Sequence, residues 1–293
     1  MNFSQPGLLA PVPDFSRYLE FRAVPDQDLR PALDALAKTA INETLVVGFG
    51  PGLVEGLGHK LDGLRTFPAL SGPGCEIPST QADIWCQIRG TDRGEIIHAA
   101  RAFTRQLGTA FQSERVVDSF RFGPGLDLTG YEDGTENPQD EAAADAALVQ
   151  GAGPGLDGSS FVAVQQWVHD LDHFESLPPE ERDNIIGRRI SDNHELAEAP
   201  ASAHVKRTAQ ESFEPEAFVV RRSMPWADAA TEGLYFVAFG NTLDAFEVQL
   251  RRMAGEEDGI LDGLFRFSRP VSGSYFWCPP VRDGRLDLTA LGL

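Results

Sequence analysis

The chain has 293 residues, and 44 Asp and Glu against 25 Lys and Arg give it a formal net charge of −19 at pH 7. Hydrophobic residues make up 42% of the sequence, enough for the core of one large domain or two modest ones. This composition argues against collagen, a disordered chain or a repeat array. Because phosphates bind clustered Lys and Arg, which acidic residues outnumber here, we expect neither nucleic acid nor a membrane surface as a partner.

The cysteine content and the start of the chain bear on the cellular compartment. Three cysteines occur without a C-x-x-C pair, and this sparse, odd number is typical of small buried thiols in a reducing compartment. No basic residue precedes an apolar run near the start, so we expect no export signal. Since no stretch approaches the roughly 18 uninterrupted apolar residues of a membrane span, the sequence predicts a cytoplasmic protein.

The first half of the chain alternates between strand and helix patterns. The segment from Arg17 alternates in polarity like a strand, and Leu29, Leu33 and Leu36 have helical spacing. In chain order, the pattern predicts a strand at 17–24, a helix at 28–38, strands at 44–50 and 82–88, a helix at 92–107 and a strand at 116–122. The order of elements is therefore β-α-β-β-α-β.

The second half repeats this order. The run from Tyr235 to Gly240 echoes the run from Leu45 to Gly50, each an apolar strand closed by glycine. The pattern predicts a strand at 160–168, helical segments between 171 and 187, strands at 218–224 and 234–239, a helix at 243–253 and a strand near 275–277. The long stretch 191–215 has no convincing period, and such loops are often functional.

Two β-α-β-β-α-β units predict an α+β fold made of duplicated ferredoxin-like halves with antiparallel sheets. We place the N-terminal half at residues 1–150 and the C-terminal half at 151–293, with a glycine-rich joint at 151–158. Each unit covers one face of its sheet with helices and leaves the other face bare. A sandwich of the two sheets, or a flat apolar ligand between them, must cover the bare faces.

The segment 130–138 holds three carboxylates between two glycines and a proline. An ordinary solvated turn explains it, because Asp-Gly and Asn-Pro are common turn dipeptides. Alternatively, the glycines aim one of these carboxylates into a cavity, where burial would raise its pKa toward that of a proton shuttle. The spacing alone leaves both interpretations open.

Histidines supply the next candidates. His204 lies inside the long loop, where its residue type and surroundings alone favour a surface histidine over a ligand. His169 and His173 have the i, i+4 separation that can bind a metal on one helix face. They straddle the end of a predicted strand, however, so we expect solvated side chains at both positions.

The paired arginines at 221 and 222 lie in a predicted strand. Because side chains alternate along a strand, Val219, Arg221 and Ser223 share one face and Arg222 lies on the other. Surface pairing with carboxylates is the ordinary explanation of such a pair. The alternative is that Arg221 lies on the face that binds a ligand and supplies a fixed positive charge there.

Taken together, three segments resemble the signature of the dye-decolorising peroxidases. They are the G-x-x-D-G loop from Gly130 to Gly134, His204 with Val205-Lys206-Arg207-Thr208, and Arg221 with Arg222-Ser223-Met224-Pro225. The likeness is closest to the bacterial YfeX-like branch and runs from the first strand to the segment 274–280. It implies two ferredoxin-like halves whose sheets enclose a cleft with haem b, iron protoporphyrin IX.

The resemblance also implies roles for single residues. His204 becomes the axial ligand of the haem iron, and Asp262 the carboxylate behind it, with Asp258 as a rival. Asp133 becomes the distal acid and Arg221 the distal cation. The remaining positions implied by the resemblance are hydrogen-bonding neighbours of the peroxide site at Ser223 and Thr135, and a contact from Arg207 to a haem propionate.

A peroxidase of this kind reduces hydrogen peroxide to water through a high-valent iron–oxo haem and oxidises small organic electron donors, such as phenols, dyes or porphyrins. A haem carrier, or a deferrochelatase-like protein that releases haem iron, would be the alternative; the paired Asp133 and Arg221 favour the peroxidase. We expect a homo-oligomer. An encapsulin-type shell is conceivable for the family, but the end of this chain gives no support for it.

Overall fold

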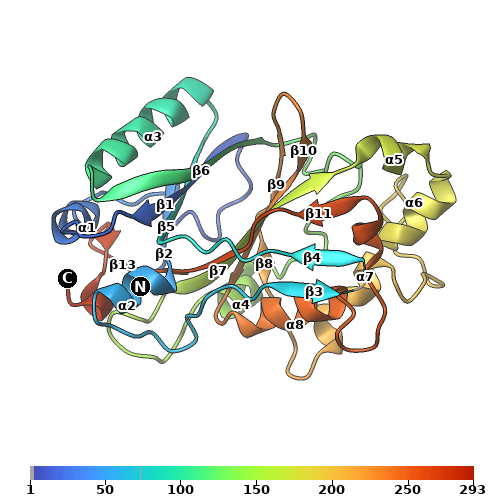
Figure 1. Cartoon of the computed structure of the whole chain (residues 1–293). Coiled ribbons are helices and arrows are strands. Elements are labelled where there is room, and N and C mark those ends of the chain that lie inside the picture. The colour runs from blue at the N-terminus through green and yellow to red at the C-terminus, as the bar shows by residue number, and fades with distance from the viewer. Residues whose placement is uncertain (1–2, 73) are drawn as a thin grey trace.

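A computed structural model describes residues 3–72 and 74–293. In the N-terminal half, β1 (Phe15–Ala23) lies between β5 (Ile84–Gly90) and β6 (Phe111–Phe120), and β2 (Leu45–Phe49) pairs with β5; all these pairings are antiparallel. The helices α1 (Arg30–Ala37) and α3 (Arg93–Leu107) lie beside this sheet at the left of Figure 1. The predicted β-α-β-β-α-β order is confirmed. The sequence did not predict α2 (Pro51–Gly56) or the hairpin of β3 (Leu70–Gly72) and β4 (Cys75–Ile77).

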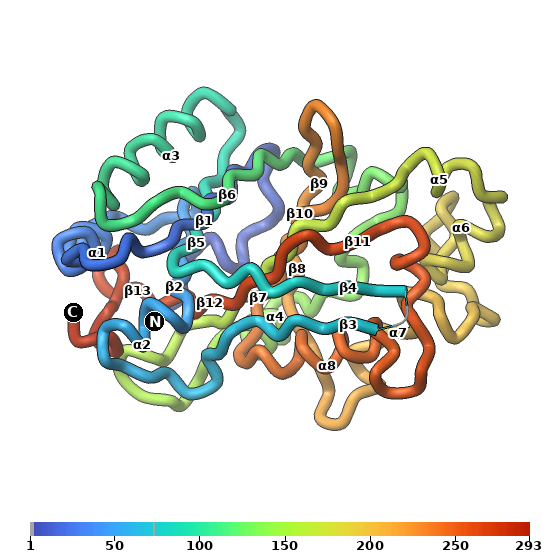
Figure 2. The backbone as a smooth tube through the Cα atoms, viewed as in Figure 1, coloured from blue at the N-terminus to red at the C-terminus, as the bar shows by residue number. Residues whose placement is uncertain are grey.

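The C-terminal half repeats this arrangement. Its central strand β7 (Ser160–His169) pairs with β10 (Glu232–Gly240) and β12 (Ser274–Cys278), and β10 pairs with β8 (Val220–Arg221) and β9 (Met224–Ala227). The helices α5 (Leu171–Ser176) and α6 (Pro179–Ile186) form one end of the molecule, and α8 (Asp244–Met253) lies along its lower side (Figure 1). The short strand β11 (Ser268–Pro270) pairs with β7 and runs close to β4 (Figure 2). The remaining elements are α4 (Asp140–Ala147), α7 (His204–Arg207), β13 (Val281–Arg282), β14 (Arg285–Leu286) and short 3-10 turns at 210–212, 263–266 and 289–291.

The two sheets join at two seams and form a closed ring of strands. Trp277 of β12 pairs with Phe49 of β2, and Ser119 of β6 pairs with Trp226 of β9. With the β7–β10 ladder, the ring runs β7-β12-β2-β5-β1-β6-β9-β10 and returns to β7. The bare faces of the two halves therefore cover each other. This packing is the predicted sandwich of the two sheets, and a flat ligand between them is not needed to cover the faces.

Alternation along the strands decides what lies inside this ring. Val162 and Val164 of β7 belong to the inner core, whereas Gln165 and Trp167 line a cavity on the opposite face. The inner core is rich in aromatic side chains: Tyr18 and Tyr235 stack with their ring centroids 4.0 Å apart. The three cysteines are buried and unpaired with one another, as their sparse number predicts.

A carboxylate is buried in this aromatic core. Glu20 is 2% exposed, accepts a hydrogen bond of 3.0 Å from the Tyr235 hydroxyl and lies 3.6 Å from the Arg115 guanidinium. Burial raises the pKa of Glu20 to about 7, and the attraction of Arg115 and the bond from Tyr235 offset only part of that effect. The folded protein thus holds a proton that the unfolded chain releases near the ordinary pKa of 4.5.

This difference predicts a pH-dependent stability. Between pH 4.5 and about 7 the folded state binds the Glu20 proton more tightly than the unfolded state, so the free energy of unfolding falls as pH rises. Glu20→Gln should match the wild type at pH 4 and exceed it at pH 8 by about 3 kcal/mol. Urea unfolding of both proteins at the two pH values measures the difference. A constant gap across this range would contradict the assignment.

Candidate functional site

The cavity that contains the main predicted site residues lies between the outer face of β7 and β10 and the helix α8. Asp133, His204 and Arg221 all line it. Its apolar walls come from both strands, from α8 and from the turn at 263–266; they include Leu234, Phe236, Phe246, Leu250, Met253 and Leu264. The site thus lies between the C-terminal sheet and its own helix, and not in a cleft between the two sheets, because the sheets pack directly on one another.

His204 is the first residue of α7, and its ring is held from behind. Its Nδ1 lies 2.9 Å from Oδ2 of Asp262, whose side chain is fully buried. The other carboxylate oxygen of Asp262 accepts a hydrogen bond of 2.8 Å from the backbone N–H of Leu264. Because Nδ1 is engaged in this way, Nε2 is the nitrogen left to bind a ligand in the cavity.

Two glycines allow the His204 segment to pack closely on its neighbours. Gly263 donates its N–H to the carbonyl of Ser202 at 2.7 Å, and a Cβ at this position would lie 3.0 Å from the carbonyl oxygen of Ile185. Gly187 has a φ of +94°, and a Cβ there would lie 2.3 Å from Val205. Glycine at both positions lets α7 approach α6 and the Asp262 turn, which brings the imidazole to its carboxylate.

Arg221 and Asp133 lie next to each other in the lining of the cavity. Nη1 of Arg221 lies 3.6 Å from Oδ1 of Asp133, and the two side chains are 19% and 23% exposed. Arg222 lies on the opposite face of the strand and donates to the carbonyls of Leu9 and Ala10, which confirms the predicted alternation. The cavity therefore contains a guanidinium paired with a carboxylate, both partly open to a ligand.

Asn137, which the sequence did not single out, aligns these two groups. Its side-chain oxygen accepts from the N–H of Arg221 at 2.8 Å, and its amide donates to the carbonyl of Arg221 at 3.0 Å. Gly134 has a φ of +77°, and a Cβ there would lie 2.6 Å from Nδ2 of Asn137. The second glycine of the loop is thus required for the amide clamp that ties the loop to β8.

Three predicted site residues lie away from this cavity. Thr135 is exposed, and its hydroxyl accepts from Asn193 at 2.9 Å. Ser223 is buried with its hydroxyl 3.4 Å from the N–H of Val237. Arg207 is also buried and makes two 2.8 Å hydrogen bonds to the carboxylate of Asp258, which lower the pKa of that acid to about 2.

These positions have clear physical causes. Arg207, the last residue of α7, is held by the carboxylate of Asp258 and the carbonyl of Arg252, so its guanidinium lies against the 252–258 segment and does not line the cavity. Asp258 is consequently engaged, and the carboxylate behind His204 is Asp262, as predicted. Ser223 falls just before β9, and neither it nor Thr135 lines the cavity.

His169 corrects another expectation, because its side chain is 7% exposed and not solvated. Its Nδ1 lies 2.6 Å from the hydroxyl of Ser268, and its Nε2 lies 3.2 Å from Asp127. His173, in contrast, is exposed as predicted. No group of three or more His, Cys, Asp or Glu side chains within residues 3–72 and 74–293 could hold a metal ion by itself.

The side chains around the cavity fit a haem. An available imidazole nitrogen opposite apolar walls suits an iron centre in a flat hydrophobic ring. Gln165 lines the same cavity at 1% exposure, and its amide nitrogen has no hydrogen-bond partner among the described residues. Since buried amides are normally paired, this donor also fits a cavity that receives another group.

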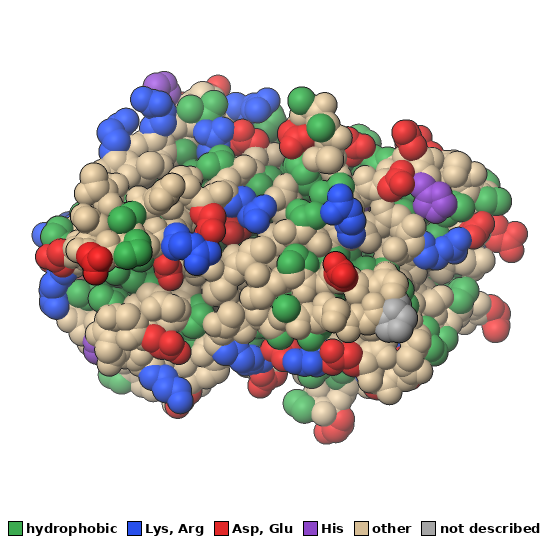
Figure 3. All heavy atoms as spheres, in the orientation of Figure 1, with side chains coloured by type: hydrophobic (Ala, Val, Ile, Leu, Met, Phe, Trp, Pro, Cys, Tyr) green, Lys and Arg blue, Asp and Glu red, His purple; other side chains and the backbone are tan. Residues whose placement is uncertain are grey.

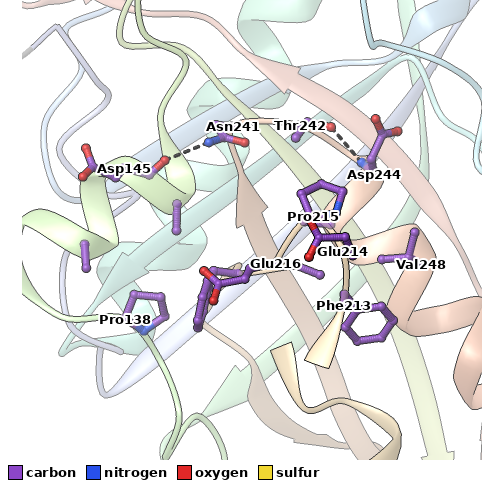
Figure 4. Close-up of a pocket in the computed structure, with 15 residues that line it drawn as sticks. Pro138, Asp145, Phe213, Glu214, Pro215, Glu216, Asn241, Thr242, Asp244 and Val248 are labelled. Atoms are coloured by element: carbon purple, nitrogen blue, oxygen red, sulfur yellow. Dashed lines mark hydrogen bonds between the residues drawn. The ribbon is translucent and has the colours of Figure 1, made fainter. Parts of the chain in front are cut away.

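A larger open hollow lies on the far side of the loop 213–218. Figure 4 shows Asp145, Glu214, Glu216 and Asp244 around it, together with Phe213, Pro215 and Val248. None of the predicted site residues lines this hollow. Elsewhere acidic and basic side chains are interspersed over the face seen in Figure 3, and no described helix is long and apolar enough to cross a bilayer.

Comparisons with known proteins agree with the resemblance. The model of the Dyp-type peroxidase N-terminal domain matches residues 9–121, and that of the C-terminal domain matches residues 125–283. A dye-decolorizing peroxidase from Mycobacterium tuberculosis is 32% identical over 224 residues, which cover 74% of this chain and 67% of the relative. One from Rhodococcus erythropolis is 32% identical over 242 residues, covering 80% and 71%.

Solved structures show the same similarity. A dye-decolorizing protein from V. cholerae superimposes with a TM-score of 0.86 at 28% identity, covering 99% of both chains. A DypB variant from Rhodococcus jostii in complex with heme has a TM-score of 0.86 at 29% identity, covering 94% of this chain and 96% of that one. The chain therefore belongs to the Dyp-type peroxidase family and is a peroxidase with a haem cofactor.

Proposed function

We propose that this protein reduces hydrogen peroxide to water while oxidising small organic donors such as phenols or dyes, and that His204 would hold the iron of its haem. The observation that carries the proposal is that one cavity is lined by an imidazole backed by a carboxylate and by a paired acid and guanidinium. When bound, the haem supplies an iron that reacts with peroxide and accepts electrons one at a time. The residues of the chain supply position, charge and proton transfer.

Asp262 sets the orientation of the His204 imidazole. Its carboxylate accepts the Nδ1–H of His204, which fixes the tautomer, orients the ring and makes Nε2 a more electron-rich ligand. The backbone N–H of Leu264 holds that carboxylate in place. An imidazole made more electron-rich in this way would support the oxidation chemistry that a bound haem would supply.

Asp133 and Arg221 act on the peroxide. The carboxylate of Asp133 accepts the proton from the inner oxygen of peroxide and delivers it to the outer oxygen, directly or through one water. Arg221 stabilises the negative charge that develops as the O–O bond breaks, because a guanidinium keeps its charge in a largely dry cavity. Asn137 holds the loop and β8 so that both groups address the same molecule.

The spectrum of the reconstituted protein tests this function. After addition of hemin, we expect a Soret band whose position shifts on mixing with one equivalent of peroxide and returns when a phenol is added. Oxidised phenol should appear in proportion to the peroxide consumed. A haem carrier would show the Soret band without phenol oxidation, and free iron with intact porphyrin would indicate iron release instead; either result would refute the proposal.

A further inference from the structure

His169 and Ser268 form part of the wall between the cavity and the outside. Both residues line the cavity and also line an open hollow on the surface beside α5. The serine is 4% exposed and the histidine side chain 7% exposed, so the pair is buried although each side meets an open space. The charged residues of the hollow are Asp170, Asp172, Glu232, Arg266 and Arg269.

The pair belongs to a chain of three hydrogen-bonded groups. The Ser268 hydroxyl lies 2.6 Å from Nδ1 of His169, and Nε2 lies 3.2 Å from Oδ1 of Asp127. Burial alone would raise the pKa of Asp127, but the hydrogen bonds from His169 and Thr129 outweigh it and hold the pKa below its ordinary value. Asp127 is therefore a carboxylate that keeps a proton on Nε2, and the Nδ1–Oγ bond can carry its proton on either atom.

Peroxide reduction also depends on a supply of protons. Reducing one H₂O₂ to two H₂O consumes two electrons and two protons. A phenol brings a proton with each electron, whereas a donor that loses only an electron leaves both protons to be drawn from solvent. Solvent reaches one part of the cavity through the partly exposed Asp133 and Arg221, and the buried pair of Ser268 and His169 offers a second path through the wall that it forms.

We propose that Ser268 and His169 relay protons from the hollow beside α5 into the cavity. With both ring nitrogens protonated, His169 donates to Asp127 and to Oγ of Ser268. The Oγ–H proton passes to a base in the cavity, and the Nδ1 proton moves onto Oγ, which leaves a neutral imidazole. A proton from the hollow then binds Oγ as the hydroxyl proton returns to Nδ1. One proton has crossed the wall, and His169 is restored.

The surrounding charges suit this direction of transfer. On the outer side, the carboxylates of Asp170, Asp172 and Glu232 collect protons from solvent at the hollow that Ser268 lines. On the inner side, the charged or titratable groups that line the cavity besides His169 itself are Asp133, Arg221 and His204. Asp133 is the base that would receive the proton. In this scheme Ser268 and His169 act through Asp133 and are positioning residues.

Two donors separate this relay from other roles of the same residues. Ser268→Ala should lower steady-state turnover with ABTS, a dye that loses an electron and no proton, by at least about tenfold. Turnover with guaiacol, a phenol, should stay within about twofold, because the donor brings its own proton. Ser268→Thr keeps the hydroxyl and should retain ABTS turnover. The control is Ser272→Ala, a buried serine of the same segment that does not line the cavity.

A second readout follows the proton itself. In weakly buffered solution with a pH indicator, proton uptake during ABTS oxidation should slow in Ser268→Ala by the same factor as turnover, and the solvent deuterium isotope effect should rise. His169→Phe should behave like Ser268→Ala, with an unchanged Soret band as the check on folding and haem content. Equal losses with both donors, or no loss with ABTS, would overturn the relay.

This inference rests on the proposed peroxidase activity, but the two can fail separately. A wild-type protein that binds no hemin or oxidises neither donor refutes the function. A wild type that oxidises both donors, beside a Ser268→Ala protein without donor selectivity, refutes only the relay.

Discussion

His204→Ala should lose the axial ligand and, with it, the Soret band of the bound haem and more than about 100-fold of peroxidase turnover. The effect is large because His204 keeps Nε2 available for a ligand, whereas both ring nitrogens of His169, the second imidazole in the cavity lining, are hydrogen-bonded. Absorption spectra after hemin reconstitution, followed by turnover with guaiacol, measure both losses. Asp262→Asn should give an intermediate loss of about 10- to 100-fold, since an amide cannot stabilise the ring as a carboxylate does.

The matched control is His173→Ala, which removes an exposed histidine from α5. Its spectrum and turnover should equal those of the wild type. If His204→Ala kept the native coordination spectrum and full turnover, the whole assignment of the cavity would be wrong.

The second large effect concerns the peroxide side of the cavity. We expect Arg221→Leu to slow the peroxide-driven change in the Soret band by about 100- to 1,000-fold, and Asp133→Asn to slow it less. The guanidinium supplies permanent charge at the breaking bond, whereas a water can replace part of the proton transfer by Asp133. Stopped-flow absorbance at several peroxide concentrations gives the two rate constants.

Suitable controls remove like charges elsewhere. Asp145→Asn alters a carboxylate of the separate acidic hollow in Figure 4, and Arg189→Leu removes an exposed arginine paired with Asp192. Neither should change the rate with peroxide. Rates that fall further in Asp133→Asn than in Arg221→Leu would reverse the ranking and make proton transfer the dominant contribution.

Most of the fold could be predicted because its signals are local. The alternation in β1 and the apolar spacing of α1 and α3 reflect burial of one face, which a sequence records directly. The strands of the β3–β4 hairpin have three residues each, too few for a period to emerge, and α4 buries only the alanines Ala143 and Ala147, which mark its buried face weakly. The seams at Trp277 and Ser119 depend on partners more than 100 residues away, which no local pattern specifies.

The candidate site, too, could be predicted only in part from the sequence. Alternation correctly separated Arg221 from Arg222, and the resemblance selected Asp133, His204 and Asp262, which the structure brings together at the cavity or behind it. Arg207 could not be placed from the sequence, because its partner Asp258 is 51 residues further along the chain, beyond β8, β9, β10 and α8. The roles of these residues, the boundary at residue 150, the YfeX-like branch, the cytoplasmic location and the homo-oligomer stay predictions.

His169 shows why some site residues escape sequence analysis. Its environment combines the end of β7, a serine of β11 and an aspartate of the loop after β6, which are remote in sequence. A histidine at the end of a strand has no distinctive neighbours in the chain itself. A buried polar cluster made by three distant segments becomes visible only when the strands are paired.

The closed circuit of strands has a consequence for how this protein can be divided. Each repeat provides the hydrogen-bonding neighbour for an outer strand of the other, so separating them would expose the backbone of β2, β6, β9 and β12 at once. Unsatisfied edges of that kind invite aggregation. We therefore expect that the haem-bearing repeat expressed on its own would be insoluble, and that co-expression of both fragments would be the minimum needed to recover it. The two repeats of this architecture therefore depend on each other for folding.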